Sequence, residues 1–327
     1  GYVPAAAELT WARRFGDCKG KTVLLIALLN ELGIEARPLL VHTEDGDLVA
    51  NRLPAMGAFD HVIVEAKIGG KSYWLDGTRL GDDQLDRLQP PAFKVGLPVT
   101  AQGSPLVPIV LPELARPTTA IALTIDASKG LSVPAPVSGE MRFSGAYASD
   151  VRQKFAGLSQ TERNRELRRI WRESFDMVTP VKVGTLSDPE TGDFVLTMSG
   201  TALMDWTADL GTRWYEIDRS RLGWRIDIAR EGEINPDAPY ALNYPDWWSS
   251  RVTITLPHAG KGFRVQGSDP VDKTVGDLFH FRRKVAFREG VVTMEADTRA
   301  LAAELPAARA QRTRAEMVEL SNGSVYI

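Results

Sequence analysis

The chain has 327 residues, of which 43% are hydrophobic and 25% charged, a balance typical of a globular protein with two or three domains. Its formal net charge of -3 gives no reason to expect nucleic acid or an anionic membrane as a partner. The longest apolar stretch, residues 23–29, is too short to span a membrane. Cys18 is the only cysteine, which excludes an intrachain disulfide and a thiolate-rich zinc site.

The segment around Cys18 predicts a helix with this cysteine in its first turn, after a shorter helix over residues 4–14. Gly33 supplies a C-terminal stop, and four leucines have the i, i+3, i+4, i+7 spacing of a buried stripe: Leu25, Leu28, Leu29 and Leu32. The free N–H groups and dipole of a helix N-terminus favour an anion, so a thiolate would be favoured at Cys18. The alternative is a cysteine that only fills space in the core.

Residues 36–41 predict a strand, and residues 42–58 a long polar connection that follows it. The acidic cluster at residues 44–47 lacks the ligand spacing of a calcium loop, so we expect a solvated turn there. A connection of this length is also a candidate substrate flap.

Residues 59–65 and 71–76 predict two strands of a β-hairpin, because a Gly-Gly turn separates them. If the residues that flank this turn pair with each other, His61 and Asp76 become diagonal neighbours on one face, with Cα atoms about 7–8 Å apart. A slip of one residue would place the two side chains on opposite faces of the hairpin.

Cysteine, histidine and aspartate together suit nucleophilic acyl chemistry. The thiolate attacks a carbonyl, the imidazole takes and returns a proton, and the carboxylate holds the imidazole in the useful tautomer. Taken singly, His61 could be a structural histidine and Asp76 could cap a turn. As a set, Cys18, His61 and Asp76 predict a catalytic site.

Five segments of the chain resemble the bacterial transglutaminase-like superfamily, and more narrowly its multidomain members with a β-rich domain on each side of the core. The segments are residues 1–4, 14–19, 32–36, 59–64 and 73–78. This resemblance covers about the first third of the chain. It implies that Cys18, His61 and Asp76 are the nucleophile, general base and orienting acid of a papain-like triad. It also favours an exported, periplasmic location.

The resemblance has one departure near the start of the chain. Family members have helices and a β-rich domain before the first matching segment, and calcium-dependent animal transglutaminases carry an upstream tryptophan that stabilises the oxyanion. Neither has a counterpart here, so the backbone N–H of Cys18 is the candidate oxyanion donor. We expect apolar surface beside the cysteine helix to contact a missing N-terminal domain, a second copy or the β-rich half of the chain.

Proline density rises over residues 89–117, which predicts an extended segment leading out of the first domain. We therefore expect a catalytic core over residues 1–115 and a β-rich domain over residues 116–327. The clearest strands predicted in the second domain are residues 120–125, 139–147, 194–203, 251–256 and 284–296.

Two helices are predicted within this β-rich half. Ser159 and Glu162 form a capping box at the start of an amphipathic helix, and a last helix covers residues 306–320. Glutamates alternate with the arginines of the first helix, which favours a solvated face over a nucleic-acid surface. The predicted fold class is α+β, with a transglutaminase-like core and an antiparallel, sandwich-like second domain.

The predicted function is acyl transfer from a peptide or amide bond through a thioester at Cys18. The expected substrate is a peptide or a protein. Hydrolysis by a cysteine protease or amidase is favoured over transglutamination, because the sequence reveals nothing that would protect the thioester from water. No cofactor and no metal are expected. The alternative is a catalytically silent scaffold that binds a peptide or a partner protein.

Overall fold

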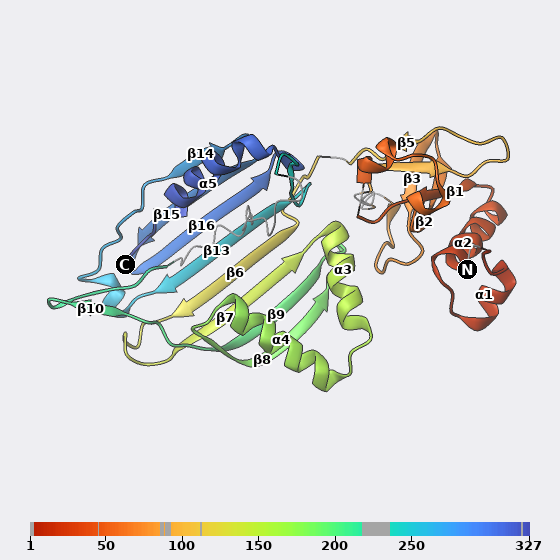
Figure 1. Ribbon diagram of the computed structural model, residues 1–327. Coiled ribbons are helices and arrows are strands. Elements are labelled where there is room, and N and C mark those ends of the chain that lie inside the picture. The colour runs from red at the N-terminus through yellow and green to blue at the C-terminus, as the bar shows by residue number, and fades with distance from the viewer. Residues whose placement is uncertain are drawn as a thin grey trace. The chain divides into compact units, whose positions relative to one another are not determined.

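The computed structural model describes residues 3–44, 46–85, 88, 93–111, 113–217, 236–321 and 323–327. The chain divides into two compact units, Gly1–Glu113 and Leu114–Ile327 (Figure 1). Strands hold 37% of the described residues and helices 25%, so this part of the protein is mostly β, and the predicted α+β class is wrong. The described residues do not form a specific transglutaminase core.

The first unit is a five-stranded sheet with two helices, and its strand order is β3-β2-β1-β4-β5. The elements are α1 (Ala7–Arg13), α2 (Cys18–Glu31), β1 (Glu35–Val41), the 3₁₀ helices η1 (Gly46–Asn51) and η2 (Met56–Ala58), β2 (His61–Ile68), β3 (Lys71–Leu75), β4 (Val95–Pro98) and β5 (Val107–Pro108). Neighbouring strands are antiparallel. The proline-rich segment supplies the last two strands, and its residues 89–92 and 112 lie outside the described part.

Helix α2 begins at Cys18 because Asp17 caps it, and the Asp17 carboxylate accepts a hydrogen bond of 2.8 Å from the Gly20 N–H. The predicted leucine stripe is only partly correct. Leu29 is buried against β2, but Leu28 and Leu32 are 47% and 75% exposed. The apolar run is almost continuous around the helix, so sequence spacing could not select the face that packs.

The β2–β3 hairpin has the predicted register. Val64 pairs with Leu75 and Ile68 with Lys71, so the numbers of paired residues sum to 139. Both turn glycines adopt positive φ angles, 59° at Gly69 and 79° at Gly70, which a tight hairpin turn of this kind requires.

The second unit is built on an eight-stranded sheet with the order β14-β15-β16-β13-β6-β7-β9-β8. Only the β13–β6 pair in this sheet is parallel. Its strands are β6 (Thr119–Asp126), β7 (Ala135–Phe143), β8 (Val178–Ser187), β9 (Phe194–Ala202), β13 (Trp247–Thr255), β14 (Val271–Val275), β15 (Phe279–Arg288) and β16 (Val291–Ala300). Short strands outside it are β10 (Thr207–Asp209), β11 (Thr212–Trp214), β12 (Tyr240–Ala241) and β17 (Glu304–Leu305).

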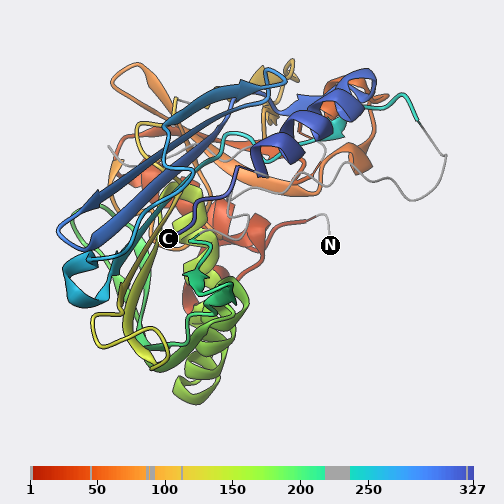
Figure 2. The same cartoon turned by 90° about the vertical axis from the view of Figure 1, so that its left-hand side faces the viewer.

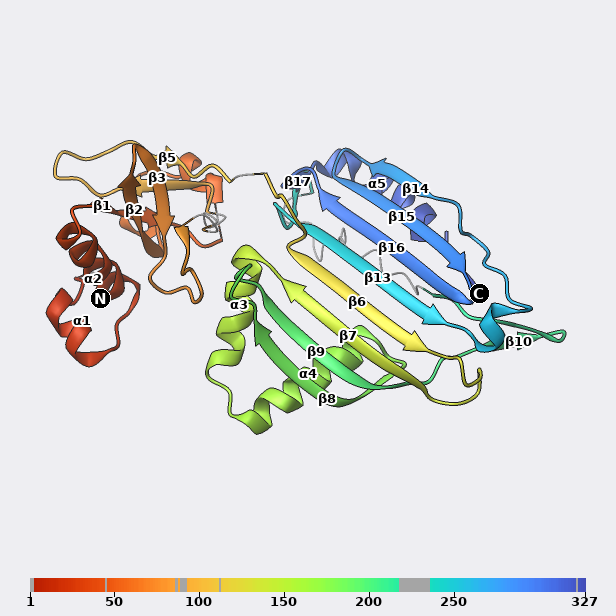
Figure 3. The same cartoon turned by 180° about the vertical axis from the view of Figure 1, so that it is seen from behind.

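Helices cover one face of this sheet. They are α3 (Gly145–Ala156), α4 (Gln160–Ser174) and α5 (Ala307–Ser321), and a 3₁₀ helix, η4 (Pro257–Gly260), follows β13. In Figure 2 the strands lie to one side of the green α4 and the blue α5, and Figure 3 shows the opposite face of the sheet, with the strands in front of these two helices. Leu167 and Trp171 of α4 pack against apolar residues of the sheet, including Leu123 and Leu196.

In the described part of the second unit, the main sheet has eight strands and helices on one face, in place of the predicted sandwich. Residues 145–147, predicted as the end of a strand, begin α3 instead. Residues 284–296 form a hairpin rather than one strand, since the chain turns at Glu289 and Gly290 with φ angles of 51° and 78°. Apolar and polar residues alternate on both sides of this turn, so the sequence pattern does not reveal the turn. The capping box of α4 and the last helix are confirmed.

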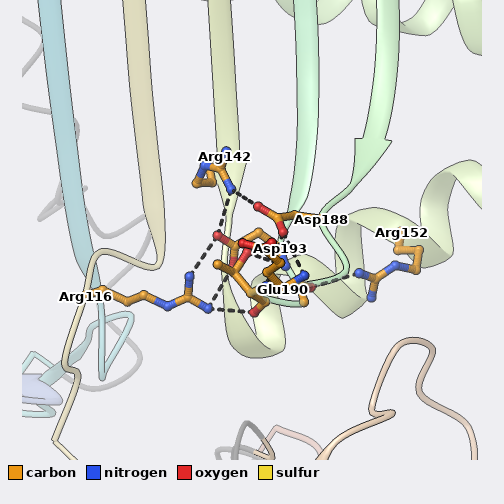
Figure 4. A network of polar contacts seen from close by, with 8 residues as sticks. Arg116, Arg142, Arg152, Asp188, Glu190 and Asp193 are labelled. Atoms are coloured by element: carbon orange, nitrogen blue, oxygen red, sulfur yellow. Dashed lines mark hydrogen bonds and ion pairs between the residues drawn. The ribbon is translucent and has the colours of Figure 1, made fainter.

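A buried carboxylate, Asp193, anchors the turn between β8 and β9 (Figure 4). Arg116 and Arg142 donate to its Oδ2 atom over 2.8 and 3.1 Å. Arg142 also donates to Asp188 over 3.0 Å, and this hydrogen bond lowers the pKa of Asp188 to about 2. Arg152 donates to the Gly192 carbonyl over 3.0 Å. Because arginine stays protonated, this cluster is a fixed set of ion pairs that holds the turn in place.

Candidate catalytic site

Three elements of the first unit carry the predicted site residues. Cys18 is the first residue of α2, His61 is the first residue of β2, and Asp76 directly follows β3. The hairpin register places His61 and Asp76 at the open end of the β2–β3 pair. All three side chains are partly shielded from solvent.

The histidine and the aspartate are in direct contact. His61 Nε2 lies 2.8 Å from Asp76 Oδ2, and the two side chains are 13% and 6% exposed. The second carboxylate oxygen, Oδ1, accepts hydrogen bonds from the Thr78 N–H at 2.8 Å and from the Thr78 hydroxyl at 2.6 Å. Asp76 is therefore held on both oxygens, and it fixes the orientation of the imidazole ring.

The contacts of His61 shift its protonation toward the charged form. The hydrogen bond to Asp76 raises the pKa of His61, and this effect exceeds that of burial, which acts in the opposite direction. Burial of Asp76 would raise its pKa, but the hydrogen bonds from His61 and Thr78 together lower it. His61 therefore stays protonated to a higher pH, and Asp76 stays ionised to a lower pH, than isolated side chains of the same types.

Cys18 is a hydrogen-bonding neighbour of the same imidazole, and this contact adds to the upward shift of the His61 pKa. Since Asp76 occupies Nε2, Nδ1 is the ring nitrogen left for the thiol. The Lys19 ammonium lies 4.0 Å from the Cys18 sulfur. The structure therefore brings together all three residues that the sequence predicts, with a cationic group beside the sulfur.

An apolar groove of about 950 Å³ borders this site. His61 and Lys19 contribute to its lining, together with residues of β1, β4 and the connection over residues 46–58. Sequence reasoning found the connection but not the groove, because its walls come from segments far apart in the chain. The turn that the sequence allowed at Asp76 is present, because the N–H and the hydroxyl of Thr78 both donate to its carboxylate.

Two other histidines also have polar partners. His280 pairs with Asp272 over 2.6 Å, but this pair is more exposed and lies in the second unit, where the sequence has no cysteine. His42 Nδ1 accepts from the Glu44 N–H over 3.3 Å at an exposed position. Among the described residues, no group of three or more histidine, cysteine or acidic side chains could hold a metal ion. None of the helices described is long and apolar enough to cross a membrane.

Comparisons with known proteins give little further identification. No family model matches the chain, and no curated protein matches it. One solved structure is similar, that of a protein from Parabacteroides distasonis described as a putative protease, at 13% identity and a TM-score of 0.44. The match covers 98% of this chain but only 45% of that one. Likeness at this level does not establish a shared fold, and membership of the transglutaminase-like superfamily is not confirmed.

Proposed function

We propose that this protein transfers acyl groups through a thioester at Cys18, and that hydrolysis of a peptide or amide bond is its main reaction. In this proposal Cys18 is the nucleophile, His61 the general base and acid, and Asp76 the residue that orients His61. The observation that carries the proposal is the contact of His61 Nε2 with Asp76 Oδ2 over 2.8 Å, together with the side-chain interaction of Cys18 with the same imidazole. This is the arrangement that activates a cysteine nucleophile.

Each step of the proposed reaction uses an atom of this site. The thiol proton moves to His61 Nδ1 while Sγ attacks the substrate carbonyl carbon, forming a C–S bond. The imidazolium then gives that proton to the leaving nitrogen as the C–N bond breaks. Water attacks the thioester in the second half of the reaction, with its proton passing through His61 to the departing thiolate. The backbone N–H of Cys18 and the Lys19 ammonium are candidate donors to the oxyanion.

Trapping of the acyl-enzyme tests the proposal. An activated ester such as p-nitrophenyl acetate should acetylate wild-type Cys18, which intact-mass and peptide mass spectrometry would detect. Cys18→Ala should carry no acetyl group at this peptide and release no burst of p-nitrophenol. His61→Ala should acetylate at least about 100-fold more slowly, because no base takes up the thiol proton. Acetylation at an equal rate in wild type and His61→Ala would mean that the thiol acts alone and that the protein is better described as a binding scaffold.

A further inference from the structure

We propose that the apolar groove beside His61 holds the leaving group of the substrate, so that the enzyme prefers an apolar residue directly after the bond it cleaves. This inference rests on the proposed function, since it assigns a binding site to the leaving group of the same substrate. It adds a specificity determinant to a site whose reaction alone would accept any leaving amine.

The position of His61 assigns the groove to the leaving-group side. In the first half of the reaction the imidazolium must approach the leaving nitrogen to within about 3 Å to protonate it. The rest of the leaving group, which is bonded to that nitrogen, must therefore lie beside the imidazole. The groove starts at this point, because its lining includes His61 and both neighbours of His61 in the chain, Asp60 and Val62.

The lining of the groove favours an apolar occupant. Val49 and Ala58 are 5% and 6% exposed, while Leu53 is 87% exposed at the edge of the same groove. Two of the polar side chains in the lining already have partners in the protein: Thr22 donates to the Val62 carbonyl over 3.3 Å, and Asp60 accepts from Thr43 over 2.6 Å. A bulky apolar side chain would cover the exposed leucine and gain the corresponding hydrophobic free energy.

The charges of the groove disfavour a cationic occupant. Lys19 contributes a basic side chain to its lining. The Lys19 ammonium also lies 4.0 Å from the reacting sulfur. A second positive charge on the leaving group would face this ammonium, so an arginine or lysine after the scissile bond is expected to bind worse than leucine.

The same subsite can be measured in the reverse direction, because an amine that binds it can attack the thioester in place of water. The amine nitrogen then forms the new C–N bond, the C–S bond breaks, and the amine proton passes through His61 to the Cys18 thiolate. The ratio of amide product to free acid is independent of how much thioester forms. This ratio therefore reports on the groove separately from the acylation step.

The experiment acetylates the protein with p-nitrophenyl acetate and offers leucinamide, glycinamide or argininamide at equal concentration and pH. Liquid chromatography with mass spectrometry measures N-acetyl amide against acetate, with Cys18→Ala giving the uncatalysed background. Leucinamide should give a ratio at least about 10-fold above that of glycinamide, and argininamide should not exceed glycinamide. Equal ratios for the three amines would overturn the inference while leaving the acyl-enzyme, and thus the proposed function, intact.

Two leucine variants localise the effect. Leu53→Asp should lower the leucinamide ratio at least about 5-fold, since it places a charge at the edge of the groove. Leu32→Asp is the matched control, because Leu32 is 75% exposed on the first unit and does not contribute to the groove lining. An equal ratio in both variants would assign the preference to another surface. If no acetyl group forms on Cys18, the proposed function fails, and this inference fails with it.

Discussion

Two buried aspartates, one in each unit, make the same kind of contact with different consequences. The side chain of Asp76 is 6% exposed and that of Asp193 is fully buried, and each accepts a charge-assisted hydrogen bond of 2.8 Å. The partner of Asp76 is a histidine, which titrates near neutral pH, whereas the partners of Asp193 are arginines, which do not. Only the first pair includes an imidazole, the side chain that exchanges a proton near neutral pH.

The groups around the two carboxylates also differ: reactive groups surround Asp76, and structural contacts surround Asp193. The His61–Asp76 pair adjoins a thiol, an ammonium group and an apolar groove. The arginines around Asp193 are directed at carboxylates and at the backbone carbonyls of Thr191 and Gly192 within one turn (Figure 4). A buried ion pair is thus informative about function only when one of its members can change its charge and another reactive group lies beside it.

The largest expected difference between the two aspartates is in the rate of acylation. Asp76→Asn should slow acetylation of Cys18 by about 10²–10⁴-fold, because the amide no longer fixes the imidazole tautomer that receives the thiol proton. Stopped-flow detection of p-nitrophenol release would measure the rate of acetylation. The dependence of this rate on pH should change as well as the rate itself. Asp193→Asn, the matched change in the second unit, should leave the rate within about twofold, and a comparable loss there would break the distinction.

For the stability of the fold, we expect the aspartate of the second unit to matter more. Asp193→Ala should destabilise the second unit by about 2–3 kcal/mol, because it leaves Arg116 and Arg142 without their shared carboxylate. The cost is not larger because these arginines are 43% and 35% exposed and can turn to water. Urea unfolding followed by peptide-resolved hydrogen exchange would assign the change to one unit. Faster exchange in the first unit alone would contradict the expected anchoring role.

The smallest effect is a dependence of stability on pH. The raised pKa of His61 contributes stability that is complete below the unfolded value of about 6.5 and is lost as pH rises through the folded pKa. The lowered pKa of Asp76 contributes stability above about pH 4 that is lost as pH falls through its folded pKa. Asp76→Asn should therefore cost about 1–2 kcal/mol more at pH 5.5 than at pH 9.

Chemical denaturation at the two pH values would measure this difference. Asp193→Ala is the control, since its partners are arginines, a residue type that stays protonated throughout this range. The loss caused by Asp193→Ala should vary less between pH 5.5 and pH 9. An equal cost of Asp76→Asn at both values would mean that the imidazolium form adds nothing to the stability of the folded chain.

Local signals in the sequence determined the positions of the three site residues. Asp17 caps α2 and so sets its start at Cys18, and the Gly-Gly turn sets the hairpin register that relates His61 to Asp76. Each of these depends on residues close together in the chain, where backbone geometry leaves few alternatives. Their catalytic roles remain a prediction that the acylation experiments test.

Contacts between distant segments decided the rest of the fold. The face of α2 that packs, the groove beside His61 and the single eight-stranded sheet all depend on which segments meet in space. Asp193 likewise meets Arg116 from 77 residues away. An almost continuous apolar helix or a run of alternating residues is compatible with several partners, and only the packed structure selects among them.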